Sequence, residues 1–292
     1  MSRLWRRLLW SWWLRAARRA ARAYVAGSDL SDALHVCRTL SPRGLAGTIC
    51  PWNGEDDSPR QVADACLAAL DGLGREDLDC TLSIKAPALG FSRDLLGELL
   101  EAAQRSRIGV HFDALTADAA DETFALIETG IRQWHDLGCT LAGRWRRSPA
   151  DGERAITLGL RVRVVKGQLP DPDAPDHEER VGFLAVVDRL AGRARHVAVA
   201  THDASLARAA LGILVAAGTP CELQLLYGLP MERGLQVARA CGVPVRIYVP
   251  YGRAWVPYCL SQARRNPRIL WWTVRDSLLG RSFRLPAGGL SG

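Results

Sequence analysis

The sequence predicts a (βα)8 barrel, a closed ring of eight parallel strands with helices between them. Short apolar runs recur at intervals of roughly 23 to 35 residues, and helical patterns separate them. Strands joined by crossover helices pair in parallel, and eight such units over about 250 residues are typical of a TIM-type barrel. A doubly wound open sheet is disfavoured, because no Gly-x-Gly-x-x-Gly turn follows an early strand.

The expected elements follow from these runs in chain order. The strands cover residues 46–52, 80–86, 108–114, 139–143, 162–167, 197–202, 222–227 and 245–249. Asp29 and Ser31 offer N-caps for a helix through Leu40, and Pro59 opens a helix that ends near Leu73. Further helical patterns occupy residues 92–104, 119–129, 178–190, 205–217 and 231–241.

Arg163 lies in the middle of an expected strand, which is an unusual place for a charge. The stretch Arg161-Val162-Arg163-Val164-Val165-Lys166-Gly167 is otherwise rich in β-branched residues. An exposed strand holds such cations at little cost, whereas a buried cation needs an anionic partner. Nearly all of the other apolar runs also end in a polar or charged group, which indicates a polar site at one end of the sheet.

Active sites of such barrels lie at the carboxyl ends of the strands. Six of the eight expected strands end in side chains that can carry chemistry: Lys85, Asp113, Arg163 with Lys166, His202 with Asp203, Gln224 with Tyr227, and Tyr248 with Tyr251. The set has cations, two carboxylates on separate strands and several tyrosines, but no metal-ligand set, no Ser-His-Asp arrangement and no pair of nearby carboxylates. It favours an anionic or electron-rich cofactor beside a small substrate.

Composition and charge exclude several other classes. The chain has 292 residues, of which 48% are apolar, and its eight cysteines are scattered, so we expect reduced thiols that mostly fill the core. No apolar run approaches the ~20 residues of a membrane span. Residues 1–28 hold seven arginines and no acid, which leaves 31 basic and 31 acidic residues in the remainder of the chain. A nucleic-acid groove is therefore not expected.

The N-terminal segment, residues 1–23, alternates Trp and Leu with Arg. A secretory signal is disfavoured, because arginines such as Arg15 and Arg18 stand where a signal peptide is neutral. Two interpretations stay open: an Arg-rich transit peptide, and an amphipathic helix with Trp and Leu on one side. Such a helix would lie on a membrane surface or dock on the barrel.

Taken together, several segments resemble the FAD-dependent proline dehydrogenases of the monofunctional bacterial type. The resemblance runs from about Tyr24 to Gly280 and rests on motifs that stand in the family's order. They are Leu82-Ser83-Ile84-Lys85, Phe112-Asp113-Ala114, Val162-Arg163-Val164-Val165-Lys166-Gly167, Ala200-Thr201-His202, Glu222-Leu223-Gln224-Leu225-Leu226-Tyr227-Gly228 and Val245-Arg246-Ile247-Tyr248-Val249-Pro250-Tyr251-Gly252-Arg253, followed by Trp255, Pro257 and Tyr258. Each fragment alone is weak, but their joint order and spacing are specific.

The resemblance implies an FAD over the barrel mouth and a role for each matching residue. Arg163 would lie by the flavin N5 and stabilise negative charge there, with Asp113 as the second catalytic residue, while Lys85 would contact the substrate carboxylate. The implied substrate-binding positions are Lys85, Tyr248, Tyr258, Ser261 and Gln262. The implied cofactor-binding positions are Ala114, Ala142, Arg163, Val165, Lys166, Gly167, Thr201, His202, Asp203 and Gln224.

The substrate-carboxylate motif departs from the family. At the third and fourth positions after the residue matching Tyr258, the family has two adjacent arginines that clamp the carboxylate, and here Ser261 and Gln262 stand there. Loss of one partner of a buried charge pair costs ~2–5 kcal/mol, roughly 30-fold to several-thousand-fold in affinity. Arg264 and Arg265, about one helical turn further on, form either a shifted clamp or a solvated helix end.

Two smaller departures concern the cofactor. Ala142 replaces a glutamine at the end of the fourth strand and so lacks a flavin hydrogen bond that the resemblance implies, and Asp203 replaces an asparagine. Both changes are compatible with an altered but working cofactor site, and also with decay of that site.

We therefore expect an enzyme that oxidises L-proline to 1-pyrroline-5-carboxylate by hydride transfer to FAD and passes electrons to a quinone-type acceptor. One alternative is a dehydrogenase of another cyclic amine or amino-acid derivative without a free carboxylate, and another is a weakened paralogue that acts as a flavin-binding or interaction module. The barrel is expected over residues 24–280, with an N-terminal helical extension at 1–23 and a tail at 281–292. We expect a cytoplasmic protein without a metal, and contact of residues 1–22 with the inner face of the membrane is a further hypothesis.

Overall fold

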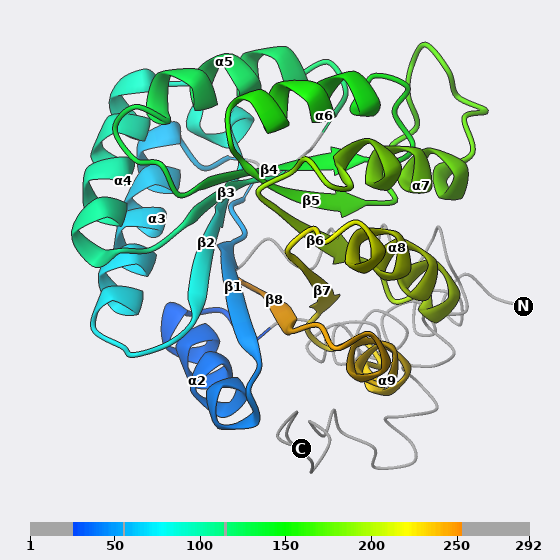
Figure 1. The fold of residues 1–292 in the computed structure, drawn as a ribbon. Helices are drawn as coiled ribbons and strands as arrows, with labels where there is room; N and C mark the ends of the chain where they lie inside the picture. The colour runs from blue at the N-terminus through cyan, green and yellow to red at the C-terminus, as the bar shows by residue number, and fades with distance from the viewer. Residues whose placement is uncertain (1–25, 55, 114–115, 253–292) are drawn as a thin grey trace, which may run out of the picture.

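The computed structural model describes residues 26–54, 56–113 and 116–252, which form a closed barrel of eight parallel strands (Figure 1). Neighbouring strands pair in chain order, and β1 pairs with β8 to close the ring. The strands are β1 (Ala46–Pro51), β2 (Cys80–Ile84), β3 (Val110–Phe112), β4 (Leu137–Ala142), β5 (Arg161–Val165), β6 (His196–Ala200), β7 (Cys221–Leu226) and β8 (Val245–Tyr251). The predicted (βα)8 barrel and all eight of its strands are confirmed.

The helices lie outside the barrel and cover it (Figure 1). They are α2 (Leu30–Leu40), α3 (Pro59–Gly74), α4 (Arg93–Ser106), α5 (Ala120–Gly130), α6 (Ser148–Thr157), α7 (Glu179–Leu190), α8 (Ala204–Ala216) and α9 (Glu232–Cys241), with short 3-10 turns at Ser41–Arg43 and Pro87–Leu89. No helix was predicted at α6, which has only ten residues and buries Ser148, Asp151, Gly152 and Ala155 rather than large apolar side chains. The expected helical extension at 1–23, the last part of the expected barrel region at 253–280 and the expected tail at 281–292 lie outside the described residues.

Two helix starts show how local sequence sets the element boundaries. The Asp32 carboxylate accepts a hydrogen bond from the backbone N–H of Asp29 at the start of α2. At the start of α3, Gln61 and Ser58 form a reciprocal capping box, and Pro59 occupies the first helical turn. These contacts satisfy backbone donors that have no partner inside the helix, so each helix begins where the polar residue stands.

Strand β5 shows how the alternation of side chains divides the core. Val162 and Val164 are buried on the helix side of the sheet, and each such side chain stabilises the fold by about 1.5–3 kcal/mol. Arg163 alternates with them and points into the barrel, where it is also buried. Of the seven cysteines in the described ranges, six are buried and none forms a disulfide, so the expectation of core-filling thiols holds for that part of the chain.

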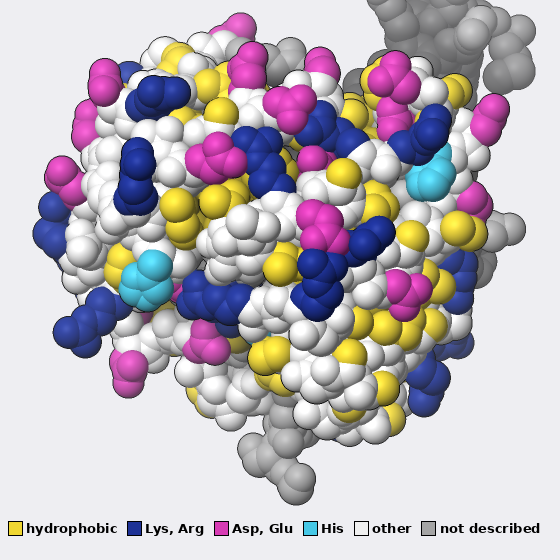
Figure 2. All heavy atoms as spheres, turned by 45° about the horizontal axis from the view of Figure 1, so that its top comes forward, with side chains coloured by type: hydrophobic (Ala, Val, Ile, Leu, Met, Phe, Trp, Pro, Cys, Tyr) yellow, Lys and Arg dark blue, Asp and Glu magenta, His cyan; other side chains and the backbone are white. Residues whose placement is uncertain are grey.

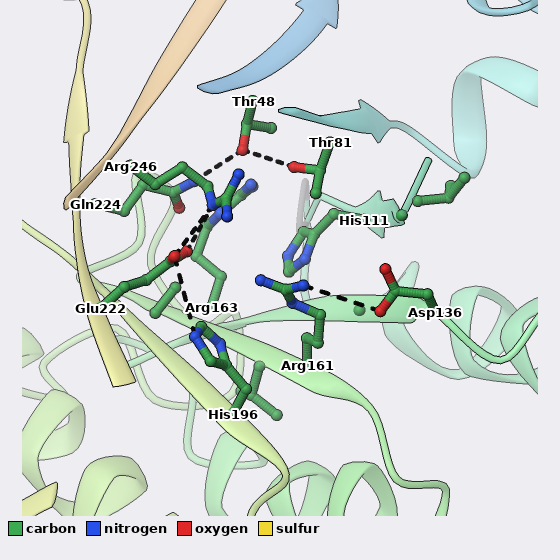
Figure 3. Close-up of a pocket in the computed structure, with 15 residues that line it drawn as sticks. Thr48, Thr81, His111, Asp136, Arg161, Arg163, His196, Glu222, Gln224 and Arg246 are labelled. Atoms are coloured by element: carbon green, nitrogen blue, oxygen red, sulfur yellow. Dashed lines mark hydrogen bonds and ion pairs between the residues drawn. The ribbon is translucent and has the colours of Figure 1, made fainter. Parts of the chain in front are cut away.

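The inside of the barrel is polar below the mouth (Figure 3). Glu222 and Arg246 are both buried there, and the Arg246 Nε lies 2.9 Å from Glu222 Oε1. Arg246 also donates to the Gly47 carbonyl and to Asp79. The remaining cavity at this end has a volume of about 20 Å³, which is room for about one water molecule.

Glu222→Ala is expected to lower the free energy of unfolding by about 3–5 kcal/mol, because the buried Arg246 guanidinium then lacks its buried anionic partner. Urea titration would measure the loss. Glu153→Ala is the matched control: Glu153 pairs with Arg193 in an exposed ion pair, which typically contributes about 0–1 kcal/mol. Equal losses in the two variants would contradict the assignment of Glu222–Arg246 as a buried structural pair.

The surface agrees with the neutral balance of charge in the body of the chain. On the face shown in Figure 2, acidic and basic side chains are interspersed rather than gathered by sign. Exposed pairs such as Arg154–Glu128 and Arg193–Glu153 account for part of this mixing. Within the described ranges, no helix is long and apolar enough to cross a membrane.

Candidate active site

A cavity of about 580 Å³ opens at the carboxyl ends of the strands. This volume is within the range of small-molecule and cofactor sites. Ten of the residues predicted for the site line it: Lys85, Asp113, Ala142, Arg163, Val165, Gly167, Thr201, His202, Gln224 and Tyr248. The barrel thus brings together side chains that lie far apart in the sequence, as the strand-end argument predicted.

Asp113 is the hub of this site, because both of its carboxylate oxygens accept hydrogen bonds. Oδ1 accepts from Arg163 Nη1 at 2.5 Å and from the Ser83 hydroxyl at 2.7 Å. Oδ2 accepts from the Tyr248 hydroxyl at 2.7 Å and lies 3.8 Å from the Cys50 sulfur. Groups from β1, β2, β5 and β8 therefore converge on one carboxylate that immediately follows β3.

Arg163 obtains the anionic partner that a buried cation needs. Its side chain is only 6% exposed and forms an ion pair with Asp113. The guanidinium carbon also lies 5.0 Å from the centroid of the Tyr248 ring, which is a cation–π distance. Pairing fixes a positive charge at the floor of a cavity with mostly apolar walls, where electrostatic interactions are stronger than in water.

Tyr248 stays protonated in this setting. Burial and the negative charge of Asp113 raise the pKa of the Tyr248 phenol well above its ordinary value, although Arg163 opposes the shift. Its hydroxyl therefore donates to Asp113 throughout the physiological pH range, and the ring is held as a wall of the cavity. Tyr248 is thus a positioned aromatic surface and not an ionised group.

Lys85 differs from Arg163 in its surroundings. It follows β2 directly, is partly exposed, and forms no ion pair with any carboxylate in the described ranges. Its ammonium nitrogen lies 5.7 Å from the centroid of the Trp52 ring, which follows β1. An ammonium on an aromatic face at the cavity wall keeps its charge available to a bound anion.

His202 is neutral and uses both of its ring nitrogens. The backbone N–H of Leu226 donates to Nε2 at 2.9 Å, so Nδ1 carries the proton and donates to the Pro230 carbonyl at 3.1 Å. Burial lowers the pKa of His202, which agrees with this tautomer. The ring therefore forms part of the cavity wall and braces the end of β7.

The backbone conformation at position 167, two residues after β5 ends, requires a glycine. Its φ of 95° is in the left-handed region, and a Cβ there would lie 3.1 Å from the Cβ atoms of both Ala142 and Arg144. The small side chain of Ala142 is buried directly beneath it and contributes an apolar wall. The chain can therefore turn tightly across the cavity rim at this point.

Two predicted cofactor positions, Lys166 and Asp203, do not line the cavity. They pair with each other, with Lys166 Nζ at 3.6 Å from Asp203 Oδ2, and Arg180 joins Asp203 at 2.9 Å. Asp203 also caps α8 by accepting from the backbone N–H groups of Ser205 and Leu206. Burial opposes ionisation of Asp203, but these hydrogen bonds and the two cations lower its pKa to about 2. The predicted cofactor role of both residues stays a prediction.

Tyr227 and Tyr251, two further residues predicted at strand ends, do not line the cavity. The other predicted positions, Ala114, Tyr258, Ser261 and Gln262, lie outside the described residues. The structure adds wall residues that sequence reasoning did not name, among them Trp52 and Trp145. The Trp145 indole donates to the Leu169 carbonyl at 3.1 Å and is almost fully buried. In the sequence, the only indication that Trp145 belongs to the site is its position three residues after the end of β4. Ser83 belongs to the motif Leu82-Ser83-Ile84-Lys85, but its hydrogen bond to Asp113 was not predicted from the sequence.

The fold and this site define a (βα)8-barrel protein whose mouth holds a paired arginine, a tyrosine, and a lysine with no carboxylate partner among the described residues. No family model matches the chain. Curated proline dehydrogenases are nevertheless similar to it over most of its length. Proline dehydrogenase 1 of Bacillus subtilis subsp. natto is 26% identical over 267 residues, covering 86% of this chain and 88% of that protein. Proline dehydrogenase of Deinococcus radiodurans is 26% identical over 283 residues, with 89% and 90% covered.

Solved structures of proline utilization A share the fold. The structure from Bdellovibrio bacteriovorus superposes with a TM-score of 0.73 at 15% identity, and that from Corynebacterium freiburgense with 0.70 at 16% identity. The superposed regions cover 84% and 95% of this chain, respectively. They cover only 32% and 34% of the two proline utilization A chains, so this chain spans about a third of their length. These structures show that the fold is shared, and the similarity to the curated proline dehydrogenases supports the family that the sequence motifs predicted.

Proposed function

We propose that the protein is an FAD-dependent dehydrogenase that oxidises L-proline to 1-pyrroline-5-carboxylate. The observation that carries the proposal is the arrangement of two cations around one cavity. Arg163 is paired with Asp113 at the floor, and Lys85 is held at the wall without a carboxylate partner among the described residues. The similarity to curated proline dehydrogenases over 86% of the chain supports the same reaction.

One structural observation supports a flavin in this cavity. Arg163 Nε and Gln224 Oε1 are buried polar atoms that find no hydrogen-bond partner within the described ranges, and both residues line the cavity. A buried unsatisfied donor or acceptor costs about 1–3 kcal/mol, so a bound group with complementary polar atoms would be favoured. Arg163, Gln224, Thr201 and Gly167 would hold such a group, which supplies a hydride acceptor when bound.

The side chains of this chain would then position and polarise the reactants. Lys85 would bind the carboxylate of proline, and the Tyr248 ring would flank the pyrrolidine ring. The fixed charge of Arg163 would stabilise negative charge that develops at the floor of the cavity. Asp113 would keep both Arg163 and Tyr248 in place, because each donates to one of its oxygens.

Reconstitution tests the cofactor assignment. Purified full-length protein should take up FAD, show the yellow flavin absorbance, and retain about one FAD per chain through gel filtration. Asp151→Asn serves as a control, because it weakens the contact with Arg147 outside the cavity and should leave FAD uptake unchanged. A folded protein that stays colourless after incubation with FAD would refute the flavoenzyme proposal.

Lys85→Met is expected to raise KM for proline by about 30-fold or more, because the substrate carboxylate loses its charged partner. A proline ester, which has no free carboxylate, should lose little. Arg189→Met is the control, because Arg189 is an exposed cation that pairs with Glu153 outside the cavity, so its loss should leave KM for both substrates unchanged. Steady-state kinetics with both substrates measures the effect, and equal losses for acid and ester would contradict it.

A second candidate activity is oxidation of a cyclic amine or amino-acid derivative without a free carboxylate. It is favoured by the residues at positions 261 and 262, which are Ser and Gln where the family's arginine pair is implied. Without that arginine pair, Lys85 is the one cavity cation that has no carboxylate partner among the described residues, which leaves less positive charge to bind a substrate carboxylate. Turnover of esters or unsubstituted cyclic amines in preference to proline would select this alternative.

The electron acceptor and the membrane contact are separate proposals. A quinone-type acceptor would take the electrons, and residues 1–22, with their arginines and tryptophans, would hold the enzyme on an anionic membrane. Co-sedimentation with vesicles that contain phosphatidylglycerol should retain the full-length chain more strongly than a chain that lacks residues 1–22. Equal binding by the two proteins would end the membrane proposal.

A further inference from the structure

Two thiols, Cys37 and Cys80, meet beside the first strand and away from the mouth cavity. Cys37 lies near the end of α2, and Cys80 opens β2. Both sulfur atoms lie against Gly47 of β1, and the two residues are only 2% and 8% exposed. Neither residue lines the mouth cavity, so the mechanism above leaves this pair without a role.

Gly47 supplies the space in which the two sulfur atoms approach each other. It pairs with Cys80 in the β1–β2 ladder. A Cβ at this position would lie 2.6 Å from the Cys80 sulfur and 3.1 Å from the Cys37 sulfur. Both sulfur atoms therefore face the same gap in β1, where any residue other than glycine would push at least one of them away.

The two thiols differ in acidity. The hydrogen bond from Cys37 and, against the effect of burial, the charge of Arg246 lower the pKa of the Cys80 thiol. The same hydrogen bond and burial raise the pKa of the Cys37 thiol. Because the thiolate is the nucleophile in thiol chemistry, and Cys80 is also the more exposed of the two residues, we assign Cys80 as the attacking group and Cys37 as the resolving group.

We propose that Cys37 and Cys80 form a modification site at which a hydroperoxide generates a disulfide between α2 and β2. The Cys80 sulfur attacks hydrogen peroxide, so that an S–O bond forms, the O–O bond breaks, and one water leaves with the thiol proton. The Cys37 sulfur then attacks the resulting sulfenic acid; the S–S bond forms, the S–O bond breaks, and a second water leaves. In total the thiols lose two electrons and two protons, which the peroxide gains.

The disulfide would join an outer helix to the barrel sheet across β1. A link between residues far apart in the sequence restricts the unfolded chain and so favours the folded state. The site is independent of the proposed dehydrogenase activity, because it shares no residue with the mouth cavity. Its consequence is a fold that becomes more resistant to heat under peroxide stress.

Peptide mapping tests the proposal on the wild-type chain. Full-length protein is reduced, freed of reductant, treated with a small excess of hydrogen peroxide, alkylated and digested with trypsin without reduction. Trypsin releases residues 23–38 and 76–85, each with a single cysteine, so a cross-linked species of these two peptides identifies the bond. We expect this species to dominate, and its absence while both cysteines stay alkylatable would overturn the proposal.

Two variants separate specific pairing from general oxidation. Cys139→Ala removes another buried thiol, one whose pKa is raised by burial, and should leave the cross-link intact. Cys37→Ala removes the resolving thiol, so Cys80 should accumulate sulfenic and then sulfinic acid instead of a disulfide. Cross-links of Cys80 to several different cysteines in the wild-type chain would contradict a site that is specific for Cys37 and Cys80.

Thermal unfolding supplies a readout that is separate from the chemistry. Peroxide-treated wild-type protein should melt about 5 °C or more above the reduced protein, and added reductant should reverse the shift. The Cys37→Ala variant should show no such increase. A disulfide that forms but lowers the melting temperature would show that it requires distortion of α2 or β2, and would refute a site that is preformed in the fold.

Discussion

Replacement of Asp113 by alanine is expected to slow proline-dependent bleaching of the flavin by about 10²–10³-fold, the effect typical of losing one preorganised charge-stabilising contact. The physical reason is the hub geometry. Asp113 accepts from Arg163 at one oxygen and from Tyr248 at the other, so its removal frees both groups at once. Stopped-flow absorbance, normalised to the FAD bound per chain, measures the effect.

The same replacement is expected to destabilise the fold by about 3–5 kcal/mol, because Arg163 stays buried without an anionic partner. Asp113→Asn keeps an acceptor and the side-chain volume but removes the charge, and it should lie between wild type and alanine in both properties. Asp151→Asn is the control, since Asp151 pairs with Arg147 outside the cavity. If Asp113→Ala turned over proline at the wild-type rate per bound FAD, the hub would have no catalytic role.

Placing arginine at both position 261 and position 262 is expected to raise kcat/KM for proline by about 30-fold to several-thousand-fold. Ser261 and Gln262 lie outside the described residues, so this expectation rests on the ungapped alignment of their flanking motifs with the family. The double arginine variant would restore two charged partners for the substrate carboxylate. Turnover of a proline ester should rise far less than turnover of proline.

Two comparisons make this experiment specific. A variant with Ser261→Met and Gln262→Met adds similar bulk without charge and should not improve proline turnover. Replacing Arg264 and Arg265 with serine should lower proline turnover only if these residues act as a shifted carboxylate clamp. If the double arginine variant left proline kinetics unchanged, loss of the clamp would be the wrong explanation for any weak binding of proline.

The barrel could be predicted because its signals are local and repeated. Each strand of the sheet is a short apolar run, and the parallel topology then places all strand ends at one rim. Arg163 within a buried strand indicated an anionic partner, but not which one. Asp113 was one of several strand-end groups, and only the closed sheet places it between Arg163 and Tyr248.

Other features of the site depend on three-dimensional packing that a sequence pattern does not report. Trp52 is a site residue because it follows β1 and its ring lies beside the Lys85 ammonium, and Trp145 because its indole donates to the Leu169 carbonyl beyond the end of β5. The pairing of Lys166 with Asp203 was missed, since both were assigned to the cofactor from the family pattern. The short helix α6 was missed because the residues that it buries are small or polar rather than large and apolar.

Anaerobic titration of the FAD-loaded protein with L-proline tests the central claim most directly. The proposed function predicts loss of the flavin absorbance near 450 nm on addition of millimolar proline, and formation of 1-pyrroline-5-carboxylate in an amount equal to the FAD reduced. Absorbance that persists with proline but falls with a carboxylate-free cyclic amine or an ester would contradict proline as the substrate while retaining the dehydrogenase. Absorbance that persists with all of these substrates would contradict a dehydrogenase of this class altogether.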